Sequence, residues 1–260
     1  MKTLRHLSLL IIFCCLFTAT RAQYVTIPDT GFVTYLQQAF PGCMIGSDFD
    51  TTCMNLNIAT VVTLENTPIA DLTGIEYFHH LLHLNCRNTG LQTIPSFPAS
   101  LETIDVSENP LVSLPDLPAG LKSLDVYRNQ LSALPAFPAT LNTLICTENP
   151  LTILPALPTA LVSIEANLTA LTSLPALPDS LTTLICRSNA LTSLPALPAG
   201  LKMLDCSDNY QLTVLPALPA GLEFLQCGGG LLSGLPSPLP DSLTRLYINF
   251  SNFTTLPALP

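Results

Sequence analysis

The chain has 260 residues, 48% of them apolar, and a mean hydropathy of +0.46, so a membrane protein has to be considered first. After residue 22, however, prolines and polar residues interrupt every apolar stretch well short of the roughly 18 residues that a spanning helix needs. The formal charge of −9 disfavours nucleic acid and anionic lipid as partners, because phosphate groups bind to positive surfaces.

Residues 1–22 have the pattern of a secretory signal peptide. Lys2 and Arg5 precede the apolar run 7–17, and small residues lead to a cleavage position after Ala22. Three of the nine basic residues leave with this segment, so six remain against 18 acidic ones and the formal charge becomes −12. We therefore expect a secreted or cell-surface protein whose mature chain has no transmembrane segment and whose charge favours a basic partner.

Residues 23–60 do not share the pattern of the rest of the chain, and we expect a small helical cap there. Asp29 precedes a segment whose apolar residues lie on one helical face: Phe32, Leu36, Ala39 and Phe40. Pro41 and Gly42 end that segment. Because an exported chain can form disulfides, we expect Cys43 and Cys53 to pair, which would stabilise the cap by about 2–3 kcal/mol.

The cap also contains a short acidic segment. Asp48 and Asp50 lie in a stretch, residues 48–52, that resembles the start of a calcium-binding loop. The glycine at the sixth position and the distal glutamate of such a loop are absent. A weak calcium site and a polar surface loop both remain open.

From residue 61 the sequence repeats with a period of 20 and later 21 residues. Each unit has the pattern L-x-x-L-x-C/V-x-x-N-x-L-x-x-L-P-x-L-P-x-x, and the stretch 61–80 is a degenerate first unit. A fixed period of this length is typical of a solenoid. Alternation in the first half of each unit predicts one strand per turn, whereas the two prolines exclude a helix and favour an extended polyproline II return path.

The units resemble the leucine-rich repeat family. Residues 101–109 (LETIDVSEN) and 121–129 (LKSLDVYRN) match its L-x-x-L-x-L-x-x-N signature, and L-P-x-L-P is similar to the short bacterial subtype of type III secreted effectors and Gram-negative surface proteins. The resemblance, over residues 60–260, implies an α/β-type repeat solenoid, mostly β. We expect a curved leucine-rich repeat with a concave parallel sheet that recognises proteins, an extended convex side and a small N-terminal helical cap.

Two inward columns have structural explanations. In the family, the asparagine of each unit lies inside the turn and bonds to the backbone of adjacent coils; here the column is Asn109, Asn129, Asn149, Asn189 and Asn209. Threonine, glycine or serine replaces it at positions 89, 169, 230 and 251, so the ladder should weaken there. Five cysteines occupy a position that valine fills in other units, which predicts buried free thiols and no metal or cofactor: Cys86, Cys146, Cys186, Cys206 and Cys227.

The outward positions form three columns, at residues 83, 85 and 87 and their equivalents in later units. Several of them carry apolar, aromatic or charged side chains that core packing does not require, which suggests contact sites. The candidate ligand-binding residues are Asp105, Asp125, Tyr127, Ile145, Glu165, Ile185, Arg187, Met203, Asp205, Phe224 and Tyr247. The alternative is a solvated sheet that merely tolerates them.

The function expected from these features is recognition without catalysis. No nucleophile elbow, phosphate loop or paired-carboxylate motif occurs, and the last histidine is His83. We expect a monomeric exported module for protein binding or adhesion through the concave face. The sequence stops at Pro260 inside a repeat, so the alternative is the recognition region of a larger enzyme or effector, such as a ubiquitin-ligase-like effector, with its catalytic domain beyond that residue. A third interpretation is a spacer.

Overall fold

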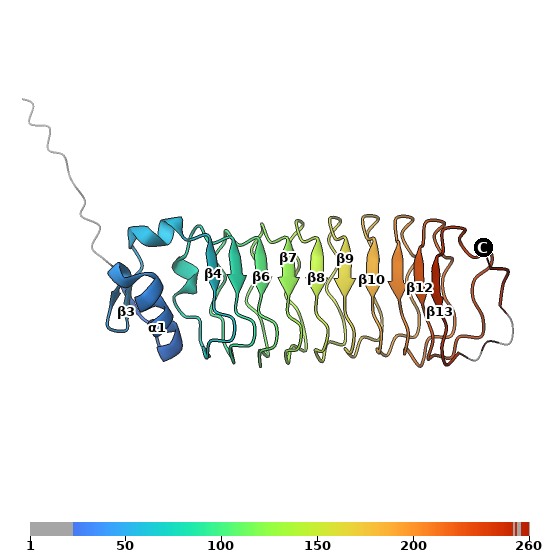
Figure 1. Ribbon diagram of the computed structural model, residues 1–260, viewed down its shortest axis with the longest axis horizontal. Helices are drawn as coiled ribbons and strands as arrows, with labels where there is room; N and C mark the ends of the chain where they lie inside the picture. The colour runs from blue at the N-terminus through green and yellow to red at the C-terminus, as the bar shows by residue number, and fades with distance from the viewer. Residues whose placement is uncertain (1–22, 252, 254–255, 260) are drawn as a thin grey trace, which may run out of the picture.

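The computed structural model describes residues 23–251, 253 and 256–259, and the predicted signal peptide lies outside them. The chain forms a solenoid whose parallel sheet contains ten strands in sequence order, placed side by side along the long axis (Figure 1). Each strand pairs in register with the strand one turn later. The strands are β4 (Val61–Thr63), β5 (His83–Asn85), β6 (Thr103–Asp105), β7 (Ser123–Asp125), β8 (Thr143–Ile145), β9 (Ser163–Glu165), β10 (Thr183–Ile185), β11 (Met203–Asp205), β12 (Phe224–Gln226) and β13 (Arg245–Tyr247).

The return path of each turn is extended. Between β5 and β13 the described chain contains no helix, and the L-P-x-L-P segments run as coil on the side opposite the sheet (Figure 1). Proline supplies no backbone N–H, so these segments could not take part in a helix or an inner strand. The predicted leucine-rich repeat solenoid is therefore confirmed. Among the described residues, no helix combines the length and apolar character that a membrane span needs.

The core consists of stacked columns of aliphatic side chains. The leucine that opens each unit is fully buried from Leu81 to Leu222. The leucine two residues after each ladder position is also fully buried, from Leu91 to Leu191. In the L-P-x-L-P segment, Leu174 is 8% exposed, whereas Leu177 is only half-buried against the core. Burial of an aliphatic side chain contributes about 1.5–3 kcal/mol, so stacking can offset the cost of ordering each turn.

The asparagine column connects consecutive turns. Asn109 Nδ2 donates to the carbonyl of Val106 in its own turn (3.0 Å) and to that of Cys86 in the preceding turn (2.7 Å). Its Oδ1 accepts from the backbone N–H of Leu91 at 2.9 Å. Asn129, Asn149, Asn189 and Asn209 repeat this arrangement. One side chain thus satisfies three buried backbone groups that would otherwise be costly.

The ladder changes at Thr169. Its hydroxyl donates to Asn189 Oδ1 and, at 3.5 Å, to the carbonyl of Ala166. It does not reach the backbone N–H of Leu151, for which the described residues offer no acceptor. Two inter-turn hydrogen bonds of the ladder, with the N–H of Leu151 and with the carbonyl of Cys146, are therefore missing among the described residues in the middle of the solenoid.

The residue before each ladder position adopts a left-handed conformation. The φ angles of these non-glycine residues lie between 49° and 59°: Asn88, Glu108, Arg128, Glu148, Leu168, Ser188, Asp208 and Phe250. A left-handed residue with a Cβ costs about 1–2 kcal/mol. The repeated turn imposes this conformation whichever side chain occupies the position, because the ladder and the sheet fix the chain on both sides of it.

The N-terminal cap covers one end of the core (Figure 1). It contains a three-stranded antiparallel sheet in the order β1-β3-β2, and the disulfide predicted between Cys43 and Cys53 is confirmed. Phe49 of the cap stacks on Phe78 of the first turns, so cap and solenoid share one core. The cap elements are β1 (Tyr24–Thr26), α1 (Thr30–Ala39), β2 (Met44–Ile45), β3 (Asp48–Asp50) and the 3₁₀ turns η1 (Pro41–Cys43) and η2 (Met54–Ile58), and a further 3₁₀ turn, η3 (Ile75–Tyr77), lies in the first turn of the solenoid.

Asp29 joins the cap to the solenoid through both of its carboxylate oxygens. Oδ1 accepts from the N–H of Phe32 at 2.8 Å and caps α1, while Oδ2 accepts from the N–H of Ala70 at 2.7 Å. The close packing of α1 leaves no room for a side chain at Gly31, where a Cβ would lie 2.1 Å from the carbonyl oxygen of Pro68.

We predict that Asp29→Ala lowers the free energy of unfolding by about 2 kcal/mol, because the helix cap and the bond to Ala70 are both lost. Asp29→Asn keeps the oxygen that caps α1 but cannot accept from Ala70, so its loss should be about half as large. Urea unfolding followed by circular dichroism measures both. Equal midpoints for the two variants and the wild type would contradict the role of Asp29.

We predict that Thr169→Asn raises the free energy of unfolding by about 1 kcal/mol, since the new side chain can accept from the N–H of Leu151. For a chain of this length the melting temperature should rise by about 2–4 °C. Thr172→Asn, an exposed substitution of the same kind in the same turn, is the matched control and should leave the melting temperature unchanged. An unchanged melting temperature for Thr169→Asn would show that the absence of these hydrogen bonds does not lower the stability of the wild type.

Candidate functional site

The outward face of the solenoid sheet is the candidate site. In β6 to β12 the middle residue of each strand is buried and the two flanking residues are half-buried, so alternate side chains reach the surface. Because the strands are in register, equivalent residues form straight columns across the sheet. All of the predicted binding residues lie on these strands, on β13 or two residues beyond a strand: Asp105, Asp125, Tyr127, Ile145, Glu165, Ile185, Arg187, Met203, Asp205, Phe224 and Tyr247.

The expectation of a third outward column is wrong in part. Ser107 is 1% exposed and Ser207 is 4% exposed, and Gly228 is buried as well, whereas Tyr127 is half-buried and Arg187 is exposed. The strands end two residues before this column, so the alternation that holds within a strand no longer sets the direction of the side chain. The exposed face therefore has two continuous columns and an interrupted third.

Three aspartates of the second column also close the turns that follow their strands. In each case Oδ1 of the aspartate accepts from the backbone N–H two residues later. The distances are 3.0 Å from Ser107 to Asp105, 2.9 Å from Tyr127 to Asp125 and 3.0 Å from Ser207 to Asp205. Aspartate favours this local turn because its short side chain reaches its own backbone. This structural role was not predicted from the sequence, although the Asp-x-Ser spacing in two units indicates it. The second carboxylate oxygen of each residue is left for other contacts.

The carboxylate at the centre of the face has an unusual environment. Partial burial raises the pKa of Asp125 to about 6, against the lowering effect of the Tyr127 N–H. The carboxylates of Asp105 and Glu165 raise this pKa further, and Arg87 lowers it. Asp125 is thus held among like charges and partly away from water.

All the lysines and arginines of the described chain except Arg245 form ion pairs with carboxylates outside the second column. Five ion pairs connect adjacent turns: Arg87–Glu108 (2.6 Å), Lys122–Glu102 (2.8 Å), Arg128–Glu148 (3.5 Å), Arg187–Asp208 (2.8 Å) and Lys202–Glu223 (3.2 Å). None of these carboxylates belongs to the second column. Within the described residues, the carboxylates of Asp105, Asp125, Glu165 and Asp205 have no ion-pair partner, and they form what we call the acidic stripe.

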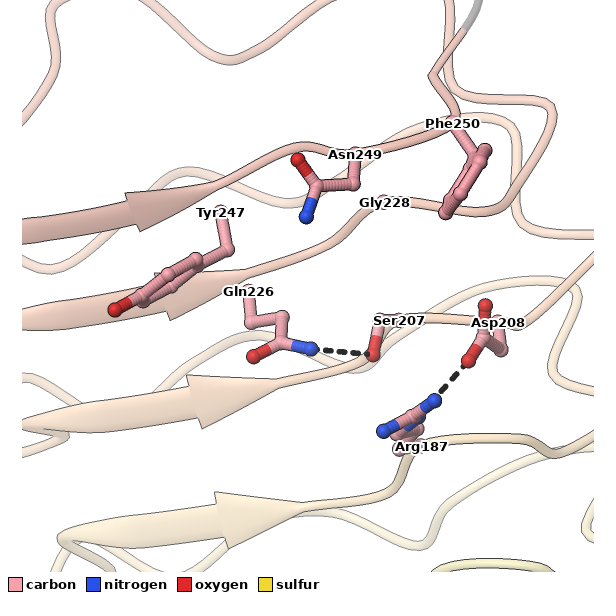
Figure 2. Close-up of a pocket in the computed structure, with 8 residues that line it drawn as sticks. All are labelled: Arg187, Ser207, Asp208, Gln226, Gly228, Tyr247, Asn249 and Phe250. Carbon is pink, nitrogen blue, oxygen red and sulfur yellow. Dashed lines mark hydrogen bonds and ion pairs between the residues drawn. The ribbon is translucent and has the colours of Figure 1, made fainter.

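Two hollows lie on this face. One, of about 350 Å³, covers β4 to β8 and is lined by residues that include His83, Ser123, Asp125 and Ile145. The other, of about 120 Å³, lies between the ends of β11 to β13 and the loops that follow (Figure 2). Small-molecule sites are usually enclosed concavities of about 300–1,000 Å³. The smaller hollow is below that size and both are open to solvent, so neither favours such a ligand.

The smaller hollow is organised by polar contacts. Arg187 Nε donates to Asp208 Oδ2 at 2.8 Å and Gln226 Nε2 donates to Ser207 Oγ at 3.3 Å, as Figure 2 shows. Tyr247 lies beside Phe224, with ring centroids 5.5 Å apart. These residues extend the surface for contacts beyond the acidic stripe.

The residues that resemble reactive groups are not gathered into a site. The five solenoid cysteines are buried free thiols, and burial raises the pKa of the Cys146 and Cys227 thiols to about 12. In the cap, Asp48 accepts from the Thr26 hydroxyl and Asp50 from that of Thr52. Across residues 23–251, 253 and 256–259, no three metal-ligating side chains come together.

Comparison with known proteins agrees with this geometry. The chain is similar to YopM, a leucine-rich effector protein from Yersinia pestis, with 31% identity over 77% of this chain and 69% of that one and a TM-score of 0.65. The chain belongs to the leucine-rich repeat family. This leucine-rich repeat protein also has the fold of a Shigella effector repeat domain (24% identity, 84% and 77% of the two chains, TM-score 0.51) and of the internalin InlF from Listeria monocytogenes (16% identity, 88% and 84%, TM-score 0.51). No family model and no curated protein matches the sequence.

We predict that Asp125→Asn stabilises the protein at pH 7.5 by about 1 kcal/mol. A folded pKa of about 6, above the value of 3.8 expected for an unfolded chain, means that ionised Asp125 destabilises the fold above pH 6 and that this penalty disappears as the pH falls towards 4. The full shift would correspond to about 3 kcal/mol, but partial exposure screens it. Asparagine keeps the turn-closing oxygen. Urea unfolding at pH 4 and pH 7.5 measures the difference, and a gain that is independent of pH would contradict the assignment.

Proposed function

We propose that this exported leucine-rich repeat protein acts as a recognition or adhesion module, secreted or at the cell surface, which binds a partner protein through the outward face of its sheet. Ten strands at about 4.8 Å make a surface roughly 43 Å long. A surface of that length matches the dimensions of a protein interface, which buries about 800 Å² on each partner. The module has no catalytic role of its own in this proposal.

The observation that carries the proposal is the unpaired acidic stripe. The five ion pairs engage every basic residue of the described chain except Arg245, and they leave Asp105, Asp125, Glu165 and Asp205 without a cation. Like charges held together on one face repel each other and lower the stability of the fold unless bound positive charges offset the repulsion. A basic surface on the partner would relieve this repulsion and would be attracted from a distance.

A labelled octalysine peptide tests the charge of the partner. We predict that it binds the wild type and that affinity falls at least tenfold in a variant with Asp105→Asn, Asp125→Asn, Glu165→Gln and Asp205→Asn, measured by fluorescence anisotropy at low salt. Asparagine preserves the turn-closing oxygen, so the fold should be retained.

A second variant of equal charge provides the control for this experiment. Glu65→Gln, Asp116→Asn, Asp179→Asn and Asp241→Asn remove four exposed carboxylates outside the stripe. This variant should bind octalysine nearly as well as the wild type. Equal losses in the two variants would show that net charge alone attracts the peptide, and the stripe would not be the binding site.

A second candidate function is the recognition region of a larger enzyme or effector whose catalytic domain lies beyond residue 260. The similarity to YopM, itself described as an effector, favours this candidate. The pattern of a signal peptide in residues 1–22 favours the first one. The outward face would have the same binding role in both.

A further inference from the structure

The outward face has a second regularity beyond its charge. In the second column, acidic and isoleucine side chains alternate over five consecutive strands from β7 to β11: Asp125, Ile145, Glu165, Ile185 and Asp205. The register pairs each of them directly with the next. At about 4.8 Å per strand, a carboxylate recurs about every 9.6 Å with one isoleucine midway.

The isoleucines have no structural role comparable with that of the aspartates. Ile145 and Ile185 are half-buried on the outward side, while the core beneath them is filled by Leu144 and Leu184, which are fully buried. An isoleucine side chain also cannot close the following turn as Asp125 and its equivalents do. Two partly exposed aliphatic side chains placed between carboxylates are therefore better explained by contact with a partner.

The side chains of the first outward column are mostly short beside the alternating residues, so they project little above the sheet. In β11 this column carries the larger Met203, whereas beside the alternating residues of β7 to β10 it carries small hydroxyl side chains: Ser123, Thr143, Ser163 and Thr183. On the other side, Tyr127 and Arg187 are larger. The hollow of about 350 Å³ extends into this part of the face at Ser123, Asp125 and Ile145. The alternating residues of β7 to β10 thus border a low strip of the face, hollowed at β7 and β8, which we call the trough and which Met203 bounds at β11.

We propose that the partner presents an amphipathic α-helix that lies along this trough, with Lys or Arg at every seventh position and an aliphatic residue between them. The inference rests on the proposed function, because it specifies the segment that binds the same face. The basic side chains would contact Asp125, Glu165 and Asp205, and the aliphatic ones would pack on Ile145 and Ile185.

The spacing of an α-helix favours this occupant. Residues 0, 3, 7, 10 and 14 of a helix share one face and lie at about 0, 4.5, 10.5, 15 and 21 Å along its axis. The five strands lie at about 0, 4.8, 9.6, 14.4 and 19.2 Å, and a flexible lysine side chain can absorb the largest difference, of about 1.8 Å.

Other backbone conformations fit less well. A β-strand presents side chains on one face about every 6.7 Å, which matches neither the isoleucines nor the carboxylates. Polyproline II repeats about every 9.3 Å, so it would meet the carboxylates but leave the isoleucines without a partner on the same face.

Three labelled 17-residue peptides on an alanine and glutamine background test the proposal. The alternating peptide has Lys at positions 1, 8 and 15 and Leu at 4 and 11. The shifted peptide has the same composition, with Lys at 1, 4 and 15 and Leu at 8 and 11. The third is the alternating peptide with prolines at positions 7 and 10, which prevent a helix. We expect the alternating peptide to bind at least tenfold more tightly than the other two by fluorescence anisotropy.

The protein variant Ile145→Glu with Glu165→Ile moves one carboxylate by a single strand without changing the composition or the net charge. It should lose at least tenfold in affinity for the alternating peptide and should prefer the shifted peptide instead. Circular dichroism and the melting temperature establish that the variant is folded. Both positions are half-buried on the outward side of the sheet, so the exchange does not alter the core beneath it.

The outcomes separate this inference from the proposed function. A preference that switches with the exchange variant supports the helix register. Equal binding of alternating and shifted peptides, or undiminished binding of the proline peptide, overturns the helix register. The proposed function still stands in that case, provided that binding is lost in the variant lacking the acidic stripe. Absence of binding by any of these peptides and by octalysine overturns both.

Discussion

A turn of twenty residues cannot satisfy its own polar groups, and the whole structure depends on the hydrogen bonds that it makes with the next turn. The N–H of Val106 donates to the carbonyl of Asp125 one turn ahead (3.0 Å), and Asn109 satisfies backbone groups of two turns at once. Because each turn must meet its neighbour in this way, the strands are held in register. The positions of the outward side chains follow from that register, so the interior determines the geometry of the exposed face.

Much of this fold could be predicted from the sequence, because its determinants recur in every unit. The leucine spacing indicates the period, the prolines exclude a helix on the return path, and Asp29 with the following apolar pattern indicates α1. Pairing of Cys43 with Cys53 was predicted from the expected export of the chain and was found in the structure. Each of these features depends on residues close together in the sequence or repeated at one interval.

The details of the face could not be predicted in the same way, because they depend on which residues meet across turns. Strand alternation suggested that Ser107 and Ser207 were exposed, but the strand ends before them and both side chains fold back onto an aspartate oxygen. Glu108, which pairs with Arg87 of the preceding turn, has a left-handed backbone that its residue type does not predict. The acidic residues were identified, but their separation from the basic residues became visible only in three dimensions.

The environment of Asp125 shows how a charge on the proposed binding face can oppose the stability of the fold. Its carboxylate accepts the hydrogen bond that closes a turn, which stabilises the fold. The same carboxylate lies among like charges, and its ionised form therefore destabilises the fold. An asparagine would close the turn equally well without the charge. The retained charge is therefore the part of this residue that folding does not explain.

The near-identity of the L-P-x-L-P return segments has a consequence for how such a surface can change. Each turn carries one residue of the second column, and its core positions hold apolar side chains similar to those of the other turns. Misaligned recombination between two such segments would add or remove a whole turn while leaving the packing of the remaining turns intact. One extra turn would displace everything after it by one strand, so that a single genetic event could reverse the order of acidic and aliphatic positions over half of the face.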